Sequence, residues 1–165
     1  MNTDEIRRSF QPDKIVILFV GESPPANGTF FYCANSQAFN YMQKAFSCVL
    51  EVGHADFLTQ FKALGCYLDD LALAPINKLP SRDKKRACEE GVRSLAERIG
   101  CFSPRHVVAI KKSIWTEVEE AVQLSGTKAT FHGVPFPGTG WQTEFVKEMA
   151  VLLPRLLGAR QCPNR

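Results

Sequence analysis

The chain has 165 residues, and its 45% hydrophobic content suffices for one sizeable core but hardly for two, so we expect a single domain over residues 1–165. Its formal net charge of +3 permits a polyanionic partner without requiring one. No apolar run approaches membrane-spanning length, and the polar first residues lack the order of a secretory signal, so we expect a cytoplasmic monomer with no membrane partner.

The first strand and the turn after it form the most informative stretch. A short helix is expected over 3–10, and a continuous apolar run predicts a buried strand over 14–20. The strand leads into the GESPP turn of residues 21–25, where glycine permits unusual dihedrals and proline fixes φ. Ligands of open α/β sheets bind beyond the carboxyl ends of strands, so Glu22 is expected at a binding edge.

Two helices and a second strand follow. The chain is irregular until about Ser36, and apolar spacing then predicts helices over 37–52 and 55–64. A strand is expected over 66–74, and the proline-rich stretch 75–80 predicts a loop.

The next helix is expected over 81–99, followed by a strand over 106–110. Its early half is basic, through Arg82, Lys84, Lys85 and Arg86. Such a charge run is typical of a solvated surface and also suits phosphate contact, and both interpretations stay open.

The last third predicts a helix through residue 124, a strand over 128–132, a loop over 133–140 and an amphipathic helix over 141–157. Pro154 is expected to kink or end that helix.

Strands that alternate with helices predict a three-layer α/β/α sandwich with a central, mainly parallel four-stranded sheet. The four strand exits then collect at one edge and form the candidate site. They carry Glu22, Asp70 or Asn77, Lys111 or Ser113, and His132.

Aromatic residues flank two of these exits and favour a flat ligand such as a base. Phe30 and Phe31 follow the first loop, and Phe136 and Trp141 bracket the last. The alternative is that Phe30 and Phe31 plug the sheet edge, although we expect at least one exposed ring.

Five segments in this order resemble the uracil-DNA glycosylase superfamily, especially the branch whose first motif reads Gly-Glu-Ala-Pro-Gly. The similar segments are GESPP (21–25), NGTFF (27–31), the strand and Pro/Asn loop (67–80), the helix and central strand (88–110), and HGVP (132–135). The resemblance implies this fold and an enzyme of DNA repair. Such a glycosylase hydrolyses the N-glycosidic bond of a deaminated or damaged base that is flipped out of DNA.

The resemblance also implies roles for residues of this chain. His132 is the expected donor to the leaving base, and Glu22 orients water or stabilises the sugar cation, although Glu22 is equally suited to shaping its loop. The expected base-binding residues are Gly21, Ser23, Phe30, Phe31 and Asp70. The expected DNA-binding residues are Lys111, Lys112, Ser113, Gly138 and Trp141, although Trp141 is equally suited to facing the core as the first residue of the last helix.

Three positions depart from the family's pattern. Asp70 stands where an asparagine usually reads the uracil edge, Ser23 where some relatives carry a water-activating residue, and Pro25 where a glycine lets backbone approach the ligand. These departures keep two alternatives open: an inactive member that binds single-stranded or damaged nucleic acid, and a binder or hydrolase of free nucleotides.

The cysteines predict reduced core thiols and no cofactor. They are Cys33, Cys48, Cys66, Cys88, Cys101 and Cys162, with no CxxC pair among them. Cys88 and Cys101 stand near cluster ligands of the similar branch, but the set of four is incomplete, so we expect no iron-sulfur cluster and no other metal.

Overall fold

The computed structural model describes residues 2–51, 53 and 55–158, and Cys162 lies outside them. The described residues form one four-stranded sheet in the order β2-β1-β3-β4. The strands are β1 (Ile17–Gly21), β2 (Cys66–Asp70), β3 (His106–Ala109) and β4 (Thr130–Gly133). Every neighbouring pair is parallel, so the expected four-stranded sheet is confirmed and is parallel throughout.

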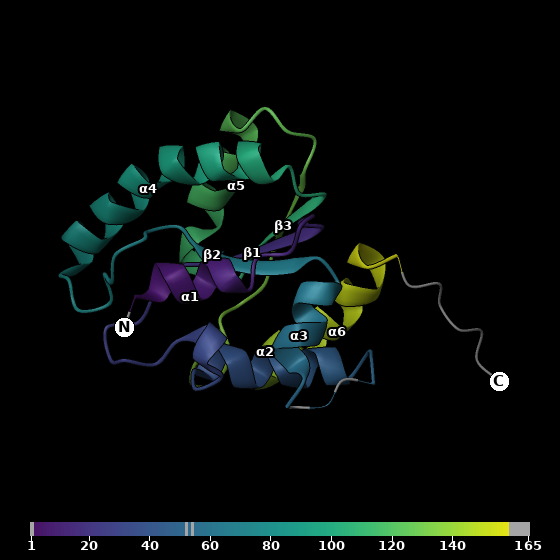
Figure 1. The fold of residues 1–165 in the computed structure, drawn as a ribbon. Coiled ribbons are helices and arrows are strands. Elements are labelled where there is room, and N and C mark those ends of the chain that lie inside the picture. The colour runs from purple at the N-terminus through teal and green to yellow at the C-terminus, as the bar shows by residue number, and fades with distance from the viewer. Residues whose placement is uncertain (1, 52, 54, 159–165) are drawn as a thin grey trace.

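Helices cover both faces of this sheet (Figure 1). On one face α4 (Ser81–Phe102) packs against α5 (Trp115–Leu124). The other face carries α2 (Gln37–Ser47), α3 (Phe57–Ala63) and α6 (Gln142–Leu156). The expected three-layer α/β/α sandwich is therefore confirmed.

The core is built around β1, which lies inside the sheet. All five of its residues are buried, as a strand covered on both faces requires. Phenylalanines of α2 and α3 contact the strand, with the Phe19 ring 5.6 Å from that of Phe61 and 6.3 Å from that of Phe46. The apolar run that predicted the strand thus supplies the centre of the core.

The outer edge of β2 is covered by two elements of the N-terminal region. Helix α1 (Thr3–Ser9) lies beside β2 in Figure 1. The buried Tyr32 hydroxyl donates to the Leu68 carbonyl at 2.9 Å and accepts from the Leu68 amide at 2.7 Å. A side chain therefore satisfies backbone groups that a further strand would otherwise pair.

Some boundaries differ from those expected. Helix α2 ends at Ser47, and β2 ends at Asp70, beyond which the chain bends. Pro154 was expected to kink or end the last helix, and it does not end it, because α6 continues to Leu156. A proline in the last turn removes a single intrahelical hydrogen bond, so the apolar face can still hold the remaining residues in place.

The connections make a topological switch point between β1 and β3. The connection after β1 leads through α2 and α3 to β2, whereas the connection after β3 leads through α5 on the other face to β4. A crevice at the carboxyl ends of two such strands is the usual ligand site of open α/β sheets.

Candidate functional site

A cavity of about 480 Å³ lies at this switch point. Its walls come from the carboxyl ends of β1, β2 and β3, the loop after β1, the start of α2 and the start of α4. It is lined by Gly21, Glu22, Ser23, Pro25, Asn27, Thr29, Phe30, Phe31, Ser36, Gln37, Ala38, Leu68, Asp70, Asn77, Lys84, Ile110, Lys111 and Phe136. All the predicted base-binding residues line it, together with Glu22 and Lys111.

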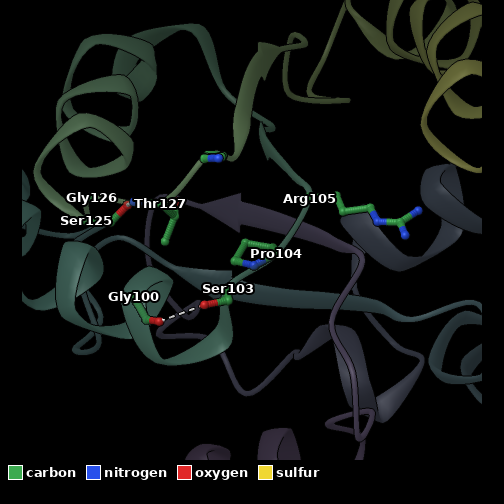
Figure 2. Close-up of a pocket in the computed structure, with 8 residues that line it drawn as sticks. Gly100, Ser103, Pro104, Arg105, Ser125, Gly126 and Thr127 are labelled. Carbon is green, nitrogen blue, oxygen red and sulfur yellow. Dashed lines mark hydrogen bonds between the residues drawn. The ribbon is translucent and has the colours of Figure 1, made fainter.

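A larger cavity, of about 690 Å³, lies at the opposite end of the sheet (Figure 2). It is formed by the segments that enter β3 and β4. Its hydroxyls bond to their own neighbours, with Ser103 donating to the Gly100 carbonyl and Ser125 to the Val122 carbonyl. The Arg105 side chain extends away from the other labelled residues. This cavity therefore lacks the converging polar groups of a binding site.

The Glu22 carboxylate is the centre of charge in the switch-point cavity. Its Oε2 lies 2.7 Å from Lys111 Nζ and 3.0 Å from Lys84 Nζ. Glu22 follows β1, Lys111 follows β3 and Lys84 belongs to α4, so three elements meet at one oxygen. The carboxylate side chain is only 11% exposed, which strengthens both ion pairs relative to surface pairs.

The loop that carries Glu22 is held by backbone bonds to the chain after β2. The Leu71 amide donates to the Gly21 carbonyl at 2.9 Å, and the Ala72 amide donates to the Glu22 carbonyl at 3.0 Å. Ser23 Oγ accepts a hydrogen bond of 3.4 Å from the Ile76 amide. Glu22 is thus fixed by its backbone, as a preorganised site requires.

The aromatic residues divide into a buried wall and an exposed rim. Phe30 and Phe31 are buried, and the Phe31 ring meets those of Tyr32 and Phe39 edge to face. They therefore plug the sheet edge while lining the cavity, as the alternative interpretation held. The exposed rings are Phe136 at the cavity, 36% exposed, and Trp141, 47% exposed.

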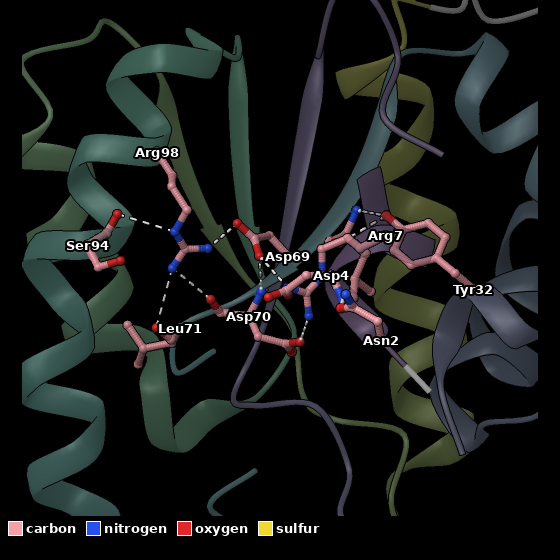
Figure 3. A network of polar contacts seen from close by, with 10 residues as sticks. Asn2, Asp4, Arg7, Tyr32, Asp69, Asp70, Leu71, Ser94 and Arg98 are labelled. Atoms are coloured by element: carbon pink, nitrogen blue, oxygen red, sulfur yellow. Dashed lines mark hydrogen bonds and ion pairs between the residues drawn. The ribbon is translucent and has the colours of Figure 1, made fainter. Parts of the chain in front are cut away.

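Behind the cavity, the two carboxylates at the end of β2 bind two guanidinium groups from neighbouring helices (Figure 3). Arg7 Nη2 donates to Asp70 Oδ2 at 2.6 Å, and Arg7 Nη1 lies 3.4 Å from Asp69 Oδ1. Arg98 of α4 donates to Asp69 Oδ2 and, at 3.0 Å, to the Asp70 carbonyl. The guanidinium of Arg7 also lies over the Phe30 ring, 5.6 Å from its centroid.

Asp70 is in an unusual electrostatic position. Burial raises the pKa of Asp70 to about 7, against the opposing attraction of Arg7, and the neighbouring Asp69 adds to the increase. Its Oδ1 lies so close to Gly21 that a Cβ at that position would approach it to 2.6 Å. Gly21 therefore leaves room for a carboxyl group whose charge changes near neutral pH.

The structure does not bring His132 to this cavity. Side chains alternate along β4, and Gly133 faces Trp115 of α5, so His132 faces the opposite side of the sheet. There it borders a different cavity, of about 450 Å³, with residues of α6, and its Nε2 lies 3.0 Å from Thr130 Oγ1. Burial and the neighbouring His106 lower the pKa of His132. The expected place of His132 at a strand exit beside Glu22 is therefore wrong.

The remaining DNA-binding candidates lie outside the cavity lining. Lys112 Nζ lies over the Trp141 ring, 4.1 Å from the ring centroid. Ser113 is inside a 3-10 turn, Lys112–Ile114, that precedes α5. Gly138 is in the loop before α6, in contact distance of Phe136. Lys112 and Trp141 thus form one exposed cationic and aromatic pair next in sequence to the cavity's Lys111.

Sequence reasoning missed Lys84 in the cavity and, in the network behind it, Arg7, Asp69 and Arg98. Lys84 belongs to the basic helix start for which phosphate contact was an open interpretation, so a signal existed. Arg7 sits in an amphipathic helix 63 residues before Asp70 in sequence, and nothing local marked its guanidinium as buried.

No group of three or more His, Cys, Asp or Glu side chains in the described part of the chain is placed to hold a metal ion. None of the helices within it is both long and apolar enough to span a bilayer. No protein-family model matches this chain, and no curated protein matches its sequence.

Proposed function

We propose that this chain is a DNA-repair base glycosylase of the uracil-DNA glycosylase type, which binds an extruded base in the switch-point cavity. The observation that carries the proposal is that Gly21, Ser23, Phe30, Phe31 and Asp70 line one cavity with Glu22. Its volume of about 480 Å³ lies within the range of roughly 300–1,000 Å³ that is typical of small-molecule sites.

In this proposal Glu22 acts on the sugar. As the bond between the base and C1′ breaks, its electron pair leaves with the base and C1′ becomes positive. The Glu22 carboxylate stabilises that cation and accepts a proton from the water whose oxygen bonds to C1′. The departing base takes up a proton from solvent, and Glu22 releases to solvent the proton that it accepted from the water, so the step balances overall. The edge of the base is held by Asp70 and by the Asn77 amide, which also line the cavity. His132 has no role in this scheme.

The Lys112 and Trp141 pair extends the proposed nucleic-acid surface beyond the cavity. Trp141 offers one ring face to Lys112, and a half-exposed indole beside a cation is a stacking platform for an unpaired base. A nucleic-acid strand that lies on this platform would place its next nucleotide near Lys111, which precedes Lys112 in sequence and lines the cavity.

A second candidate function is binding without cleavage. It is favoured by the neutralisation of Glu22 through Lys84 and Lys111 and by the absence of any imidazole in the lining of the cavity among the described residues. In this case the cavity holds a damaged or unpaired base, and the glycosidic bond stays intact.

One assay separates these functions. Duplex and single-stranded oligonucleotides that carry uracil, hypoxanthine or xanthine are incubated with the protein, and abasic sites are scored by strand cleavage in alkali. We expect cleavage that falls by about 10²-fold or more in Glu22→Gln, because a transition-state charge contact is lost. Glu89→Gln is the matched control, since Glu89 is an exposed residue of α4 that pairs only with Lys85 among the described residues.

The other outcomes contradict either the proposed activity or its assignment to this cavity. Oligonucleotide binding with no abasic sites on any lesion supports the non-catalytic function. Tight binding of mononucleotides alone supports a free-nucleotide protein. Cleavage that is abolished by His132→Ala but unaffected by Glu22→Gln would place the chemistry at β4 and overturn the assignment of the cavity.

A further inference from the structure

We propose that Lys84 and Lys111 form a phosphate clamp and that Glu22 occupies it as an internal counter-anion until the phosphate of a ligand displaces it. The inference rests on the proposed function for its catalytic consequence, and its binding part stands on the geometry of these three side chains.

Two cationic side chains converge on one carboxylate oxygen in the cavity. Lys84 and Lys111 come from different layers of the fold, yet both ammonium groups contact the same atom, Glu22 Oε2. Two like charges held this close repel each other unless an anion lies between them. Bringing both lysines to the switch point therefore requires a negative group there, and the three side chains together keep a net positive charge.

The two lysine side chains are more accessible to solvent than the carboxylate that pairs with them. The Lys84 and Lys111 side chains are 29% and 31% exposed, whereas Glu22 is 11% exposed. Both lysine side chains thus reach solvent, and the Glu22 side chain is more deeply buried than either of them. A phosphate offers more oxygens than a carboxylate and a comparable or larger negative charge, so it can contact both lysines at once. Lys84 also lies near the amino end of α4, whose dipole and missing side-chain cap favour an anion.

Phosphate binding to the two lysines has a consequence for Glu22. With the cavity empty of ligand, both lysines compensate its charge, which weakens any attraction to a sugar cation. Once a phosphate takes the lysines, the carboxylate is released and faces the rest of the cavity. A nucleotide that carries its phosphate would therefore activate the carboxylate that acts on its own sugar, whereas a nucleoside without phosphate would not.

The test measures binding without cleavage, so that it is independent of glycosylase activity. Inorganic phosphate, deoxyuridine and deoxyuridine monophosphate are titrated by calorimetry at low ionic strength. We expect the monophosphate to bind at least about tenfold more tightly than the nucleoside, because hydrogen bonds to charged groups are stronger than neutral ones. Lys84→Met and Lys111→Met should each remove most of that difference, and their aliphatic stems are kept.

The direction in which Glu22→Gln changes the affinity for phosphate decides whether Glu22 is the displaceable anion. Glu22→Gln should raise the affinity for inorganic phosphate severalfold, because the resident competitor loses its charge; an ordinary ligand contact would give a loss. Unchanged or weaker phosphate binding in folded Glu22→Gln overturns the inference. Lys85→Met is the matched control on α4, since Lys85 does not line the cavity, and an equal loss there would equally overturn it.

Two further arms identify the source of the phosphate. An oligonucleotide with neutral methylphosphonates flanking a deoxyuridine is compared with its normal counterpart. Weaker binding of the neutral strand assigns the clamp to a DNA diester, whereas a clamp that responds only to the mononucleotide assigns it to a phosphate monoester. If neither responds and inorganic phosphate has no effect on the protein, the clamp does not exist, whatever the abasic-site assay shows.

Discussion

Asp70 and Arg7 form a deeply buried ion pair, and the burial of both charged groups costs free energy. Arg7 Nε is buried and has no hydrogen-bond partner among the described residues. Burial works against the charge of Arg7, but the carboxylates of Asp70 and Asp69 raise its pKa nonetheless. The raised pKa of Asp70, about 7, means that the folded protein binds a proton there more tightly than the unfolded chain does.

This gives a signed prediction for stability. The contribution of Asp70 to the free energy of unfolding is fully present below its unfolded pKa of about 4 and is lost as the pH rises through 7. We expect the stability of the wild type relative to Asp70→Asn to fall by about 1 kcal/mol per pH unit across this window. Urea denaturation of both proteins between pH 4 and 8 measures it. A relative stability that increases with pH would show that Arg7 holds Asp70 as the anion.

Residue-level prediction from the sequence succeeded where a strand exit decides position. Glu22 comes directly after β1 and Lys111 comes two residues after β3, so the parallel sheet brings them to one edge. His132 was misplaced because the expected strand, 128–132, put it at the exit, whereas β4 runs from Thr130 to Gly133 and turns its side chain to the α6 face. Arg7 depended on a contact between distant segments, which local patterns do not reveal.

At the scale of elements, α4 packs against the chain after β2 through a glycine. A Cβ at Gly91 would approach the Leu71 carbonyl oxygen to 2.6 Å, and that oxygen belongs to backbone that cannot easily move. Gly100 lies in the same helix, where an added Cβ would meet the Ser125 carbonyl at an ordinary 3.7 Å. Both positions are helical, and they differ in the room that is available for an added Cβ.

We therefore expect opposite effects from the same substitution. Gly91→Ala should destabilise the protein by about 1–3 kcal/mol, because it overpacks the contact with Leu71. Gly100→Ala should be neutral or stabilising by up to about 1 kcal/mol, because alanine has the higher helix propensity. Thermal or urea unfolding of the two variants gives the comparison. A similar change in both would mean that helix propensity alone acts at these sites.

The existence of each helix and strand followed from periodicity, but several ends did not. Apolar spacing continued to residue 52 for the second helix, yet α2 ends at Ser47, where turn bonds from Val49 and Leu50 to Phe46 take over. Strand β2 ends at Asp70, although the apolar residues continue to 74, because Leu71 and Ala72 instead bond to the loop that carries Glu22. Local turn hydrogen bonds accompany the end of α2, and hydrogen bonds between segments distant in sequence accompany the end of β2.

At the scale of the whole molecule, alternation of strands and helices was enough to predict the parallel sandwich. Strand order was beyond the sequence, because β2 and β3 are consecutive in the chain and yet lie on opposite sides of β1. The switch point, and with it the location of the cavity, follows from that order.

The charge distribution gives a prediction for the intact molecule in salt. Single-stranded oligonucleotide affinity should fall as salt rises, and Lys112→Met should reduce the log–log slope by about 0.7, the value for one lost phosphate contact. Trp141→Ala should weaken binding by about 1–3 kcal/mol with the slope unchanged, since stacking carries no charge. Fluorescence anisotropy at several salt concentrations measures both.

Lys128→Met controls for the loss of net charge. Lys128 lines the cavity at the opposite end of the sheet, so its removal should leave affinity and slope close to those of the wild type. An effect as large as that of Lys112→Met would indicate that binding follows overall charge rather than this surface.

The residues that cover the outer edge of β2 affect the tendency of this chain to self-associate. An uncovered outer strand is a template on which a second molecule can add a strand of its own, and that is a common route to aggregation. Tyr32 occupies the donor and acceptor of Leu68, and α1 lies beside the strand, so this route is blocked on one side of the sheet. The opposite edge strand, β4, is only four residues long and offers few backbone groups to a strand of a second molecule. Loss of the first nine residues would remove α1 and expose Asp69, Asp70 and the outer edge of β2, and we expect the shortened chain to be prone to self-association.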